Sequence, residues 1–201
     1  LLSLPIHPFS KVSDQKVSDN KRYLDFLERM QWPLRRLLIA GIHVHVGVET
    51  GEMAIAAVNG MATGAGMDMS LHCDIRFAAK SAIFRASYAA FGLVPGNGGT
   101  YFLPRIVGTS KALELFWSTD VIESEEALRI GLVNKVFDDK ILMEKTIEWV
   151  KNVLDQAPIP VRVIKRLIYQ NMNMDLLTSL DLISSHMSFA RTSYDHAEAI
   201  S

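Results

Sequence analysis

The chain has 201 residues, of which 49% are hydrophobic and 21% are charged, which predicts a soluble globular protein of one domain, with or without an appendage. Its 21 Lys and Arg residues nearly balance its 22 Asp and Glu residues, so the net charge of −1 argues against a nucleic-acid partner. The single cysteine, Cys73, excludes an internal disulfide and favours a cytoplasmic location, with the mitochondrial matrix as the alternative. No apolar run reaches the ~18–20 residues of a membrane span, so no membrane partner is expected.

The first forty residues predict an irregular start followed by two short helices. Residues 1–18 are interrupted by prolines and serines. A helix is expected over 19–30, and after a break at Pro33 the pattern continues helically over 34–40. Because the chain begins at Leu1 without an initiator Met or a basic flank, we expect a fragment rather than a natural start.

A strand is predicted over Gly41–Thr50, where apolar residues alternate with polar or small ones. His43 and His45 share one face of this strand, a spacing that can bind a metal ion. No third ligand is evident nearby, so a solvated strand face is the favoured interpretation and no metal site is predicted.

Between residues 53 and 137 the pattern alternates between strands and helices, as in an α/β core. The expected strands are 53–58, 73–79 and 132–137, and the stretch 81–90 is ambiguous. The expected helices are 66–72, a brief one ending at Leu103, one from a Thr109 or Ser110 cap to about Trp117, and one from Ser124 to Gly131.

From residue 138 onward every periodic segment is helical, with helices expected over 139–156, 159–171 and 175–198. We therefore divide the chain into a core at 1–137 and a helical region at 138–201. The apolar faces of this region exceed what one helix pair can bury, which predicts an oligomer. The residues concerned are Leu167, Ile168, Leu176, Leu177, Leu180, Ile183 and Met187.

The turn Gly60–Asp68 is crowded with small residues and leads from an apolar run into a helix with an acid in its first turn. Small residues let a ligand approach the backbone, and a helix N-terminus offers unpaired N–H groups to a negative charge. A dinucleotide fingerprint is incomplete, because Met69 stands where the third glycine belongs, and a phosphate loop lacks its Gly-Lys-Ser/Thr ending. Close packing of helix on strand is the alternative use of these residues.

Five motifs at and after this turn fall in order at a recognisable spacing. They are A-A-V-N-G-x-A-x-G-x-G-x-D at 56–68, C-D-I-R-F-A at 73–78, G-L-V-P-G-x-G-G-x-x-x-L-P-R-x-V-G at 92–108, and A-L-E-L with E-A-L-x-x-G-L-V-N-K-V at 112–136. Together they resemble the enoyl-CoA hydratase/isomerase (crotonase) superfamily. The resemblance is gapless from about Ile55 to Val136 and continues more loosely to about Ser201.

This resemblance implies an α/β fold with a crotonase-like spiral of ββα turns in 1–137, N-terminally incomplete. The C-terminal helical region at 138–201, itself truncated, is implied to build homotrimers or hexamers. The shared chemistry of the family is stabilisation of the enolate oxygen of an acyl-CoA thioester by two backbone N–H groups. No cofactor is implied, since coenzyme A enters as part of the substrate.

By resemblance, Ala65 donates one of these two N–H groups at the start of the helix, and Gly64 and Gly66 keep the backbone around it open. Asp68 lies where many hydratases carry a catalytic glutamate, and a carboxylate there can move protons beside the carbonyl. The alternative is that Asp68 only complements the helix N-terminus.

The remaining family positions differ from the usual pattern. Tyr88 stands where the second glutamate is expected, as a hydrogen-bond donor or as a packing residue. Asn97 replaces an aspartate of one branch; it either orients substrate or water or, as favoured here, caps the next helix. The second N–H donor is expected at Lys11, within Phe9–Asp14, where Ala-Gly of the family has become Lys-Val.

The resemblance therefore implies an acyl-CoA enzyme of the hydratase/isomerase type, with Asp68 handling protons. A single carboxylate favours a 1,3-proton shift over water addition, because one group can serve twice. A decarboxylase or thioester hydrolase of the same family is one alternative. A non-catalytic acyl-CoA-binding relative is the other, and it is favoured by the departures at Tyr88, Asn97 and Lys11.

Overall fold

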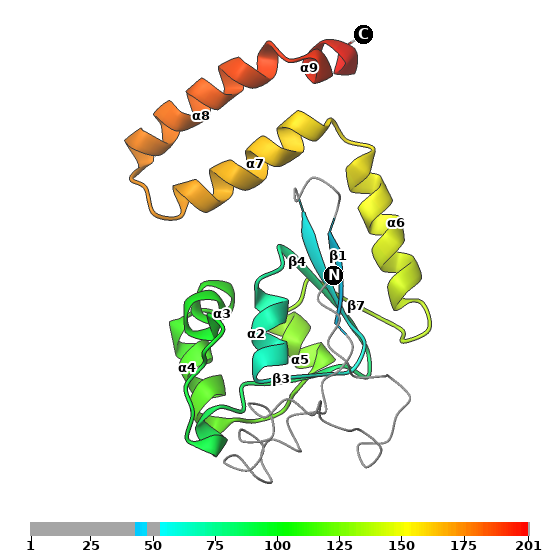
Figure 1. Ribbon diagram of the computed structural model, residues 1–201, viewed down its shortest axis with the longest axis vertical. Helices are drawn as coiled ribbons and strands as arrows, with labels where there is room; N and C mark the ends of the chain where they lie inside the picture. The colour runs from blue at the N-terminus through cyan, green and yellow to red at the C-terminus, as the bar shows by residue number, and fades with distance from the viewer. Residues whose placement is uncertain (1–42, 48–52, 201) are drawn as a thin grey trace, which may run out of the picture. The chain divides into compact units, whose positions relative to one another are not determined.

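The computed structural model describes residues 43–47 and 53–200, which are coloured in Figure 1. These residues divide into two units, with 53–143 in the first and 144–200 in the second. The division into a core at 1–137 and a helical region at 138–201 remains a prediction for the whole chain.

The strands of the first unit form two small sheets. The larger sheet has the order β1 (His43–Gly47), β2 (Ala54–Val58), β4 (Ile75–Ala79), β7 (Lys135–Phe137). The smaller sheet has the order β3 (Met61–Thr63), β5 (Ile83–Arg85), β6 (Ile122–Glu123). The pairs β2–β4, β4–β7 and β3–β5 are parallel, whereas β5–β6 is antiparallel.

From β2 to β5, successive strands alternate between the two sheets, which produces the expected ββα turns. One turn consists of β2, β3 and helix α2 (Ala65–Leu71); the next consists of β4, β5 and the helices that follow. The predicted strand at 41–50 is confirmed as β1, and those at 53–58 and 73–79 are confirmed as β2 and β4. Strands β3 and β6 were not predicted, because strands of three and two residues are too short for a period-two pattern.

The core of the first unit lies around β2 and β4, whose residues are almost completely buried. Strand β2 is an apolar run, and β4 is apolar except for the buried Arg76, because both faces of a parallel strand are covered. Small side chains in these strands, such as Ala56, Ala57 and Ala78, let neighbouring elements approach closely, and large side chains fill the remaining space. The largest fully buried apolar residues are Phe77, Phe84, Ile55, Met67, Leu103 and Leu132.

Two helices differ from their predicted starts and ends. Helix α3 (Gly99–Val107) continues past Leu103 with Pro104 inside it, because one proline removes only one hydrogen bond while Leu103 stays buried. Helix α4 (Thr109–Ser118) starts after Gly108, whose φ of 83° suits glycine, so the predicted side-chain cap at Thr109 or Ser110 is wrong.

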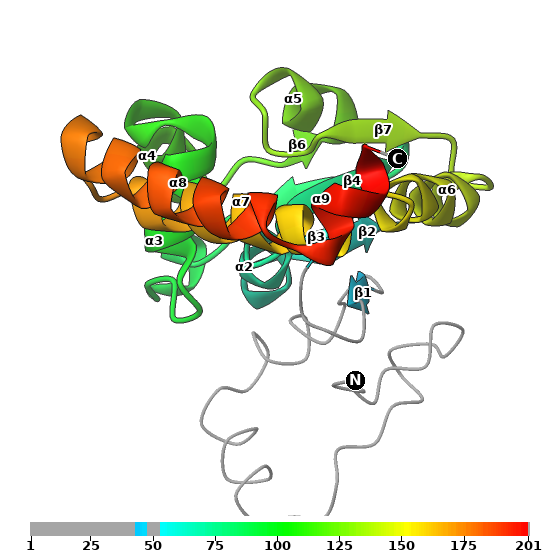
Figure 2. The ribbon, with the colours of Figure 1, turned by 90° about the horizontal axis from the view of Figure 1, so that it is seen from above.

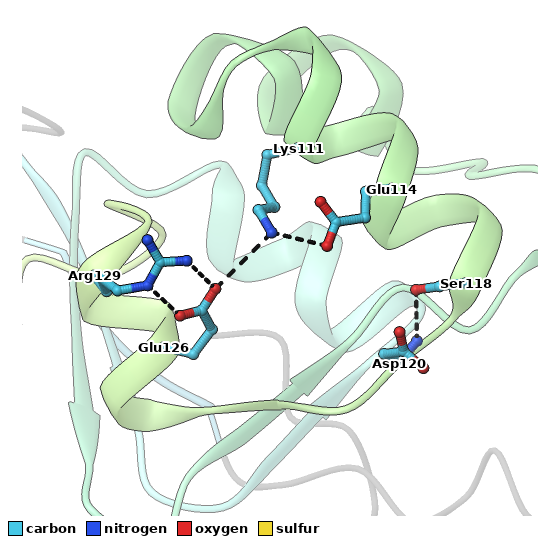
Figure 3. Close-up of polar contacts among 6 residues, drawn as sticks. All are labelled: Lys111, Glu114, Ser118, Asp120, Glu126 and Arg129. Atoms are coloured by element: carbon cyan, nitrogen blue, oxygen red, sulfur yellow. Dashed lines mark hydrogen bonds and ion pairs between the residues drawn. The ribbon is translucent and has the colours of Figure 1, made fainter.

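A charged network links α4 to helix α5 (Ser124–Arg129), as Figure 3 shows. Lys111 Nζ lies 2.8 Å from Glu114 and 3.9 Å from Glu126, and Arg129 holds both oxygens of Glu126 at 2.5 and 2.7 Å. Most of these groups are exposed, so water and salt screen each pair and its contribution to stability is small. The network aligns two helices without dominating their stability.

The second unit is helical. It contains most of α6 (Leu142–Leu154), together with α7 (Pro158–Asn171), α8 (Leu176–Arg191) and α9 (Tyr194–Ala199). Helices α7 and α8 pack against each other, as both views show (Figures 1 and 2). The start of α7 is tied to α9, because the backbone N–H of Ile159 donates to Asp195 at 2.7 Å.

The prediction of a single helix over 175–198 is wrong, since the helix is interrupted at Thr192 and Ser193, between α8 and α9. Ser193 accepts from the N–H of His196 and starts the new helix, just as Asp175 caps α8. Such side chains compete with the helical backbone for its hydrogen bonds. Among the described helices, none combines the length and the apolar character that a bilayer crossing requires.

Candidate active site

The turn from β3 into α2 is built around Gly64. This glycine is buried, has φ 51° and ψ −119°, and donates its N–H to the carbonyl of Arg85 at 2.9 Å. The backbone angle requires glycine, and the space is tight as well, because a Cβ at this position would lie 3.3 Å from Ser87 Oγ. The turn therefore places α2 directly against the segment that follows β5.

Ala65 is the first residue of α2, as predicted, and it is exposed. In the part of the chain that the structure describes, no acceptor takes up its N–H, while Gly66 beside it is half-buried. A free N–H at this place is what a negatively charged ligand atom can bind.

Asp68 lies in the first turn of α2 with only 2% of its surface exposed. Its Oδ2 accepts a hydrogen bond from the Tyr88 hydroxyl at 2.6 Å, and the backbone N–H groups of Asn97 and Gly99 also donate to its carboxyl. Burial raises the pKa of the Asp68 carboxyl, while these three donors and the nearby His72 offset part of the rise. The result is an oriented carboxylate that is more basic than an ordinary aspartate.

Tyr88 reaches Asp68 because of the parallel pairing of β3 and β5. Thr63 is in register with Arg85, so the chains leaving the two strands emerge at the same edge of the sheet. A hydrogen bond of 3.1 Å from Thr63 Oγ1 to Ser87 Oγ ties them together. Burial and the Asp68 carboxylate both raise the pKa of the Tyr88 phenol, which therefore stays neutral and donates its proton. Tyr88 was interpreted either as a hydrogen-bond donor or as a packing residue, and in the structure it donates a hydrogen bond to Asp68.

Asn97 lies in the loop that closes over this pair. The predicted helix cap is wrong, because α3 is preceded by Gly98 at φ 81° and has no side-chain cap. The Asn97 side chain instead hydrogen-bonds toward Tyr88 and lowers the pKa of the phenol. The fold thus brings Asp68, Tyr88 and Asn97 together, although Tyr88 and Asn97 follow Asp68 by 20 and 29 positions in the chain.

Two residues that the sequence analysis did not single out also belong to this cluster. Gly99 is buried so close to Asp68 that a Cβ would overlap its carboxyl, and the doubled glycine at 98–99 was the available signal. His72 lies one turn after Asp68, and its Nε2 is 2.7 Å from the carbonyl oxygen of Asn97. The spacing of four residues between Asp68 and His72 was the only hint in the sequence.

Other predicted positions lie outside the described residues. Lys11 and the segment Phe9–Asp14 are among them, as are the side chains of His43 and His45, although β1 itself is described. Within 43–47 and 53–200, no three His, Cys, Asp or Glu side chains gather as metal ligands would.

Comparison with known families agrees with this geometry. The family model described as enoyl-CoA hydratase/isomerase matches residues 48–198, well over half of the chain. A second model, glutamate-cysteine ligase family 2, matches residues 1–67 and supports no family assignment for the whole chain. Because the first match begins at residue 48, the segment with Lys11 lies outside it.

Individual relatives agree with the first match. The chain is 38% identical over 149 residues to a short-chain-enoyl-CoA hydratase of Clostridioides difficile, covering 74% of this chain and 96% of that sequence. It is also 38% identical over 146 residues to the short-chain-enoyl-CoA hydratase of Clostridium acetobutylicum, covering 73% of this chain and 56% of that protein. An enoyl-CoA hydratase structure from Bacillus anthracis superposes with a TM-score of 0.71 at 36% identity, covering 73% of this chain and 57% of the other.

The chain thus spans little more than half the length of two of these three relatives. The fold expected from the resemblance, an α/β spiral followed by helices, is confirmed by the structural superposition. With a family match through every element from β2 to α8 and relatives above 30% identity, the resemblance is confirmed: the chain belongs to the enoyl-CoA hydratase/isomerase family.

Proposed function

We propose that the protein acts on acyl-CoA thioesters as an enzyme of the hydratase/isomerase type, with Asp68 as its proton-transferring group. The observation that carries this proposal is the buried carboxylate in the first turn of α2, held by three donors and made more basic by burial. Relatives named short-chain-enoyl-CoA hydratase support the substrate class. A buried aspartate with a raised pKa is suited to accept and return protons.

The thioester oxygen would be held by the N–H of Ala65. This group starts α2, is exposed, and adds the helix dipole to its own partial charge. Gly64 and Gly66 on either side leave room for a substrate to approach the backbone. The second donor of this oxyanion hole is proposed at Lys11, and one such donor is typically worth ~10²–10³ in rate.

The chemistry that suits one carboxylate is a 1,3-proton shift. Asp68 would take a proton from the carbon beside the thioester carbonyl, and the resulting negative charge would rest on the oxygen held by Ala65. The same Asp68 would then return the proton two carbons further along, so no water or second reactant is consumed. Tyr88 would stabilise the ionised Asp68 through its 2.6 Å hydrogen bond and would not compete as a base.

The experiment is a direct assay of the protein with crotonyl-CoA and with a 3-enoyl-CoA. We expect turnover of both substrate types to be measurable and isomerisation of the 3-enoyl-CoA to be the faster reaction. Release of CO₂ from a carboxylated acyl-CoA, or of free CoA, would instead favour a decarboxylase or hydrolase. Acyl-CoA binding by calorimetry without turnover of any of these would overturn the proposal in favour of a non-catalytic relative.

We further propose a homotrimer or a hexamer built through the helical region. Several apolar side chains on α7 and α8 are exposed in the single chain, which is unfavourable unless another chain covers them. They are Ile164, Ile168, Leu176, Leu177, Leu180 and Met187. Light scattering should give three or six times the chain mass of 22.4 kDa, and a mass of one chain would contradict the proposal.

No cofactor is needed for this proton transfer, because coenzyme A arrives with the substrate. A cytoplasmic location also remains a prediction, based on cysteine usage alone.

A further inference from the structure

The helix that carries Asp68 contacts the loop over the site at a second point. His72 ends α2, and its ring nitrogen Nε2 lies 2.7 Å from the carbonyl oxygen of Asn97. A carbonyl can only accept a hydrogen bond, so Nε2 carries the proton and donates it. Asp68 and His72 are four residues apart and therefore lie on the same face of the helix.

The loop held in this way is the one whose backbone contacts Asp68. The N–H groups of Asn97 and Gly99 both donate to the Asp68 carboxyl. Gly98 between them has φ 81°, and its missing Cβ would lie 3.5 Å from His72 Nε2 and 3.1 Å from the Phe102 ring. Two side chains on one face of α2 therefore bind the backbone of Asn97. His72 donates to its carbonyl oxygen, and Asp68 accepts from its N–H group.

The His72 ring is itself held in place. Its centroid lies 4.6 Å from that of Phe102 on α3, with the two planes tilted by 53°. The exposed imidazole is therefore fixed by one aromatic contact and one hydrogen bond, although it lies at the surface.

We propose that His72 is a positioning residue that keeps the Asn97–Gly99 segment on the Asp68 carboxyl through its hydrogen bond to the Asn97 carbonyl. If this bond is lost, the loop keeps its backbone contacts with Asp68 but loses the second attachment to α2, so the two N–H donors leave Asp68 more often. The effect on turnover rests on the proposed function of Asp68. The effect on the loop does not, and it can be measured separately.

The test compares His72→Phe with His72→Gln. Phenylalanine keeps a ring against Phe102 and removes the donor, whereas the glutamine amide can donate to the same carbonyl. Hydrogen exchange of the peptide covering residues 95–102 should be ~3–10-fold faster in His72→Phe, as expected from loss of one net hydrogen bond, and within ~2-fold of wild type in His72→Gln.

A matched control is His186→Phe, which removes another bond between a histidine ring and a backbone carbonyl, that of Leu182 within α8. Exchange at 95–102 should not change in this variant. If His72→Phe does not fold, His72→Asn replaces it, because its amide is one methylene too short to reach the Asn97 carbonyl.

Activity supplies a second readout. In His72→Phe, kcat should fall roughly 10-fold with KM nearly unchanged, because the loop and Asp68 are misplaced rather than absent. The acid limb of the pH profile should also move to higher pH, since Asp68 loses N–H donors and a nearby histidine; Tyr88 and His72 are the titratable groups facing it.

The outcomes separate the two proposals. Unchanged exchange in His72→Phe, or failure of a folded His72→Gln to restore slow exchange, would overturn the positioning role. If the wild-type protein turns over no acyl-CoA while exchange changes as expected, the proposed function fails and the role of His72 in holding the loop stands.

Discussion

Replacing Asp68 by asparagine is expected to lower kcat by roughly 10²–10⁴, the usual contribution of a positioned acid or base. The amide has nearly the same size as the carboxyl, so the buried site stays filled. It cannot accept a proton, and its NH₂ group would face the N–H groups of Asn97 or Gly99 that now donate to Asp68. KM for the acyl-CoA should change little, because the proposed mechanism has Asp68 act on the reacting carbons and not on the CoA.

The pH dependence of the wild-type protein follows from the same carboxyl. Asp68 must be ionised to accept a proton, and burial holds its pKa above the ordinary value of 3.8. As the pH falls through this raised pKa, Asp68 becomes protonated, so kcat/KM should decline at a higher pH than an ordinary aspartate would give. Tyr88→Phe removes a donor to the carboxylate and should move this decline to still higher pH.

Asp120→Asn is the matched control for Asp68→Asn. Asp120 is exposed, and its hydrogen bond to Ser118 Oγ uses the backbone N–H, which the substitution leaves in place (Figure 3). Its steady-state kinetics should equal those of the wild type. Full activity of a folded Asp68→Asn with a 3-enoyl-CoA would remove Asp68 from the mechanism.

Gly99→Ala is the second substitution with a large expected effect. A Cβ at residue 99 would lie 2.8 Å from Asp68 Cγ and still closer to Oδ1, and both residues are buried. The carboxyl would have to turn away from Tyr88 or the loop would have to lift. We expect a loss of about 1–3 kcal/mol in the free energy of unfolding, typical of overpacking, and at least a ~10-fold loss of kcat from the misplaced carboxyl.

Gly96→Ala provides the comparison within the same loop. A Cβ at residue 96 meets no atom within 4 Å, and its backbone is not in the left-handed region. Urea unfolding and steady-state kinetics of the two variants should therefore diverge, with Gly96→Ala close to wild type. Equal behaviour of the two variants would mean that loop geometry, and not the contact with Asp68, controls the site.

Asp68 and Tyr88, the hydrogen-bonded pair at the centre of the candidate site, differ in their ability to accept a proton. Burial and the Asp68 carboxylate raise the pKa of the Tyr88 phenol and keep it neutral. Only one of the two groups is therefore available as a base near neutral pH. This asymmetry is the reason for expecting proton transfer between carbons to be faster than addition of water, and the paired substrate assay measures that difference.

Much of the fold followed from local pattern. The apolar runs of β2 and β4 and the small-residue turn before α2 predicted these elements close to their observed bounds. The failures have physical causes. Strands β3 and β6 exist only because a neighbouring strand pairs with them. Helices α8 and α9 are separated by Thr192 and Ser193, and Ser193 caps a new helix in the middle of an otherwise helical pattern.

The sequence by itself determined the family, the start of α2, and the identity of Asp68 and Ala65 as candidate site residues, because these depend on residue type at short spacing. Only the tertiary structure decided what surrounds Asp68. Tyr88, Asn97 and Gly99 follow it by 20 to 31 positions, and they meet it because parallel strands β3 and β5 end at one edge and the next loop folds back over α2. No local pattern encodes such a return of the chain, since its register is set by burial of the sheets and by glycines that leave space for a carboxyl.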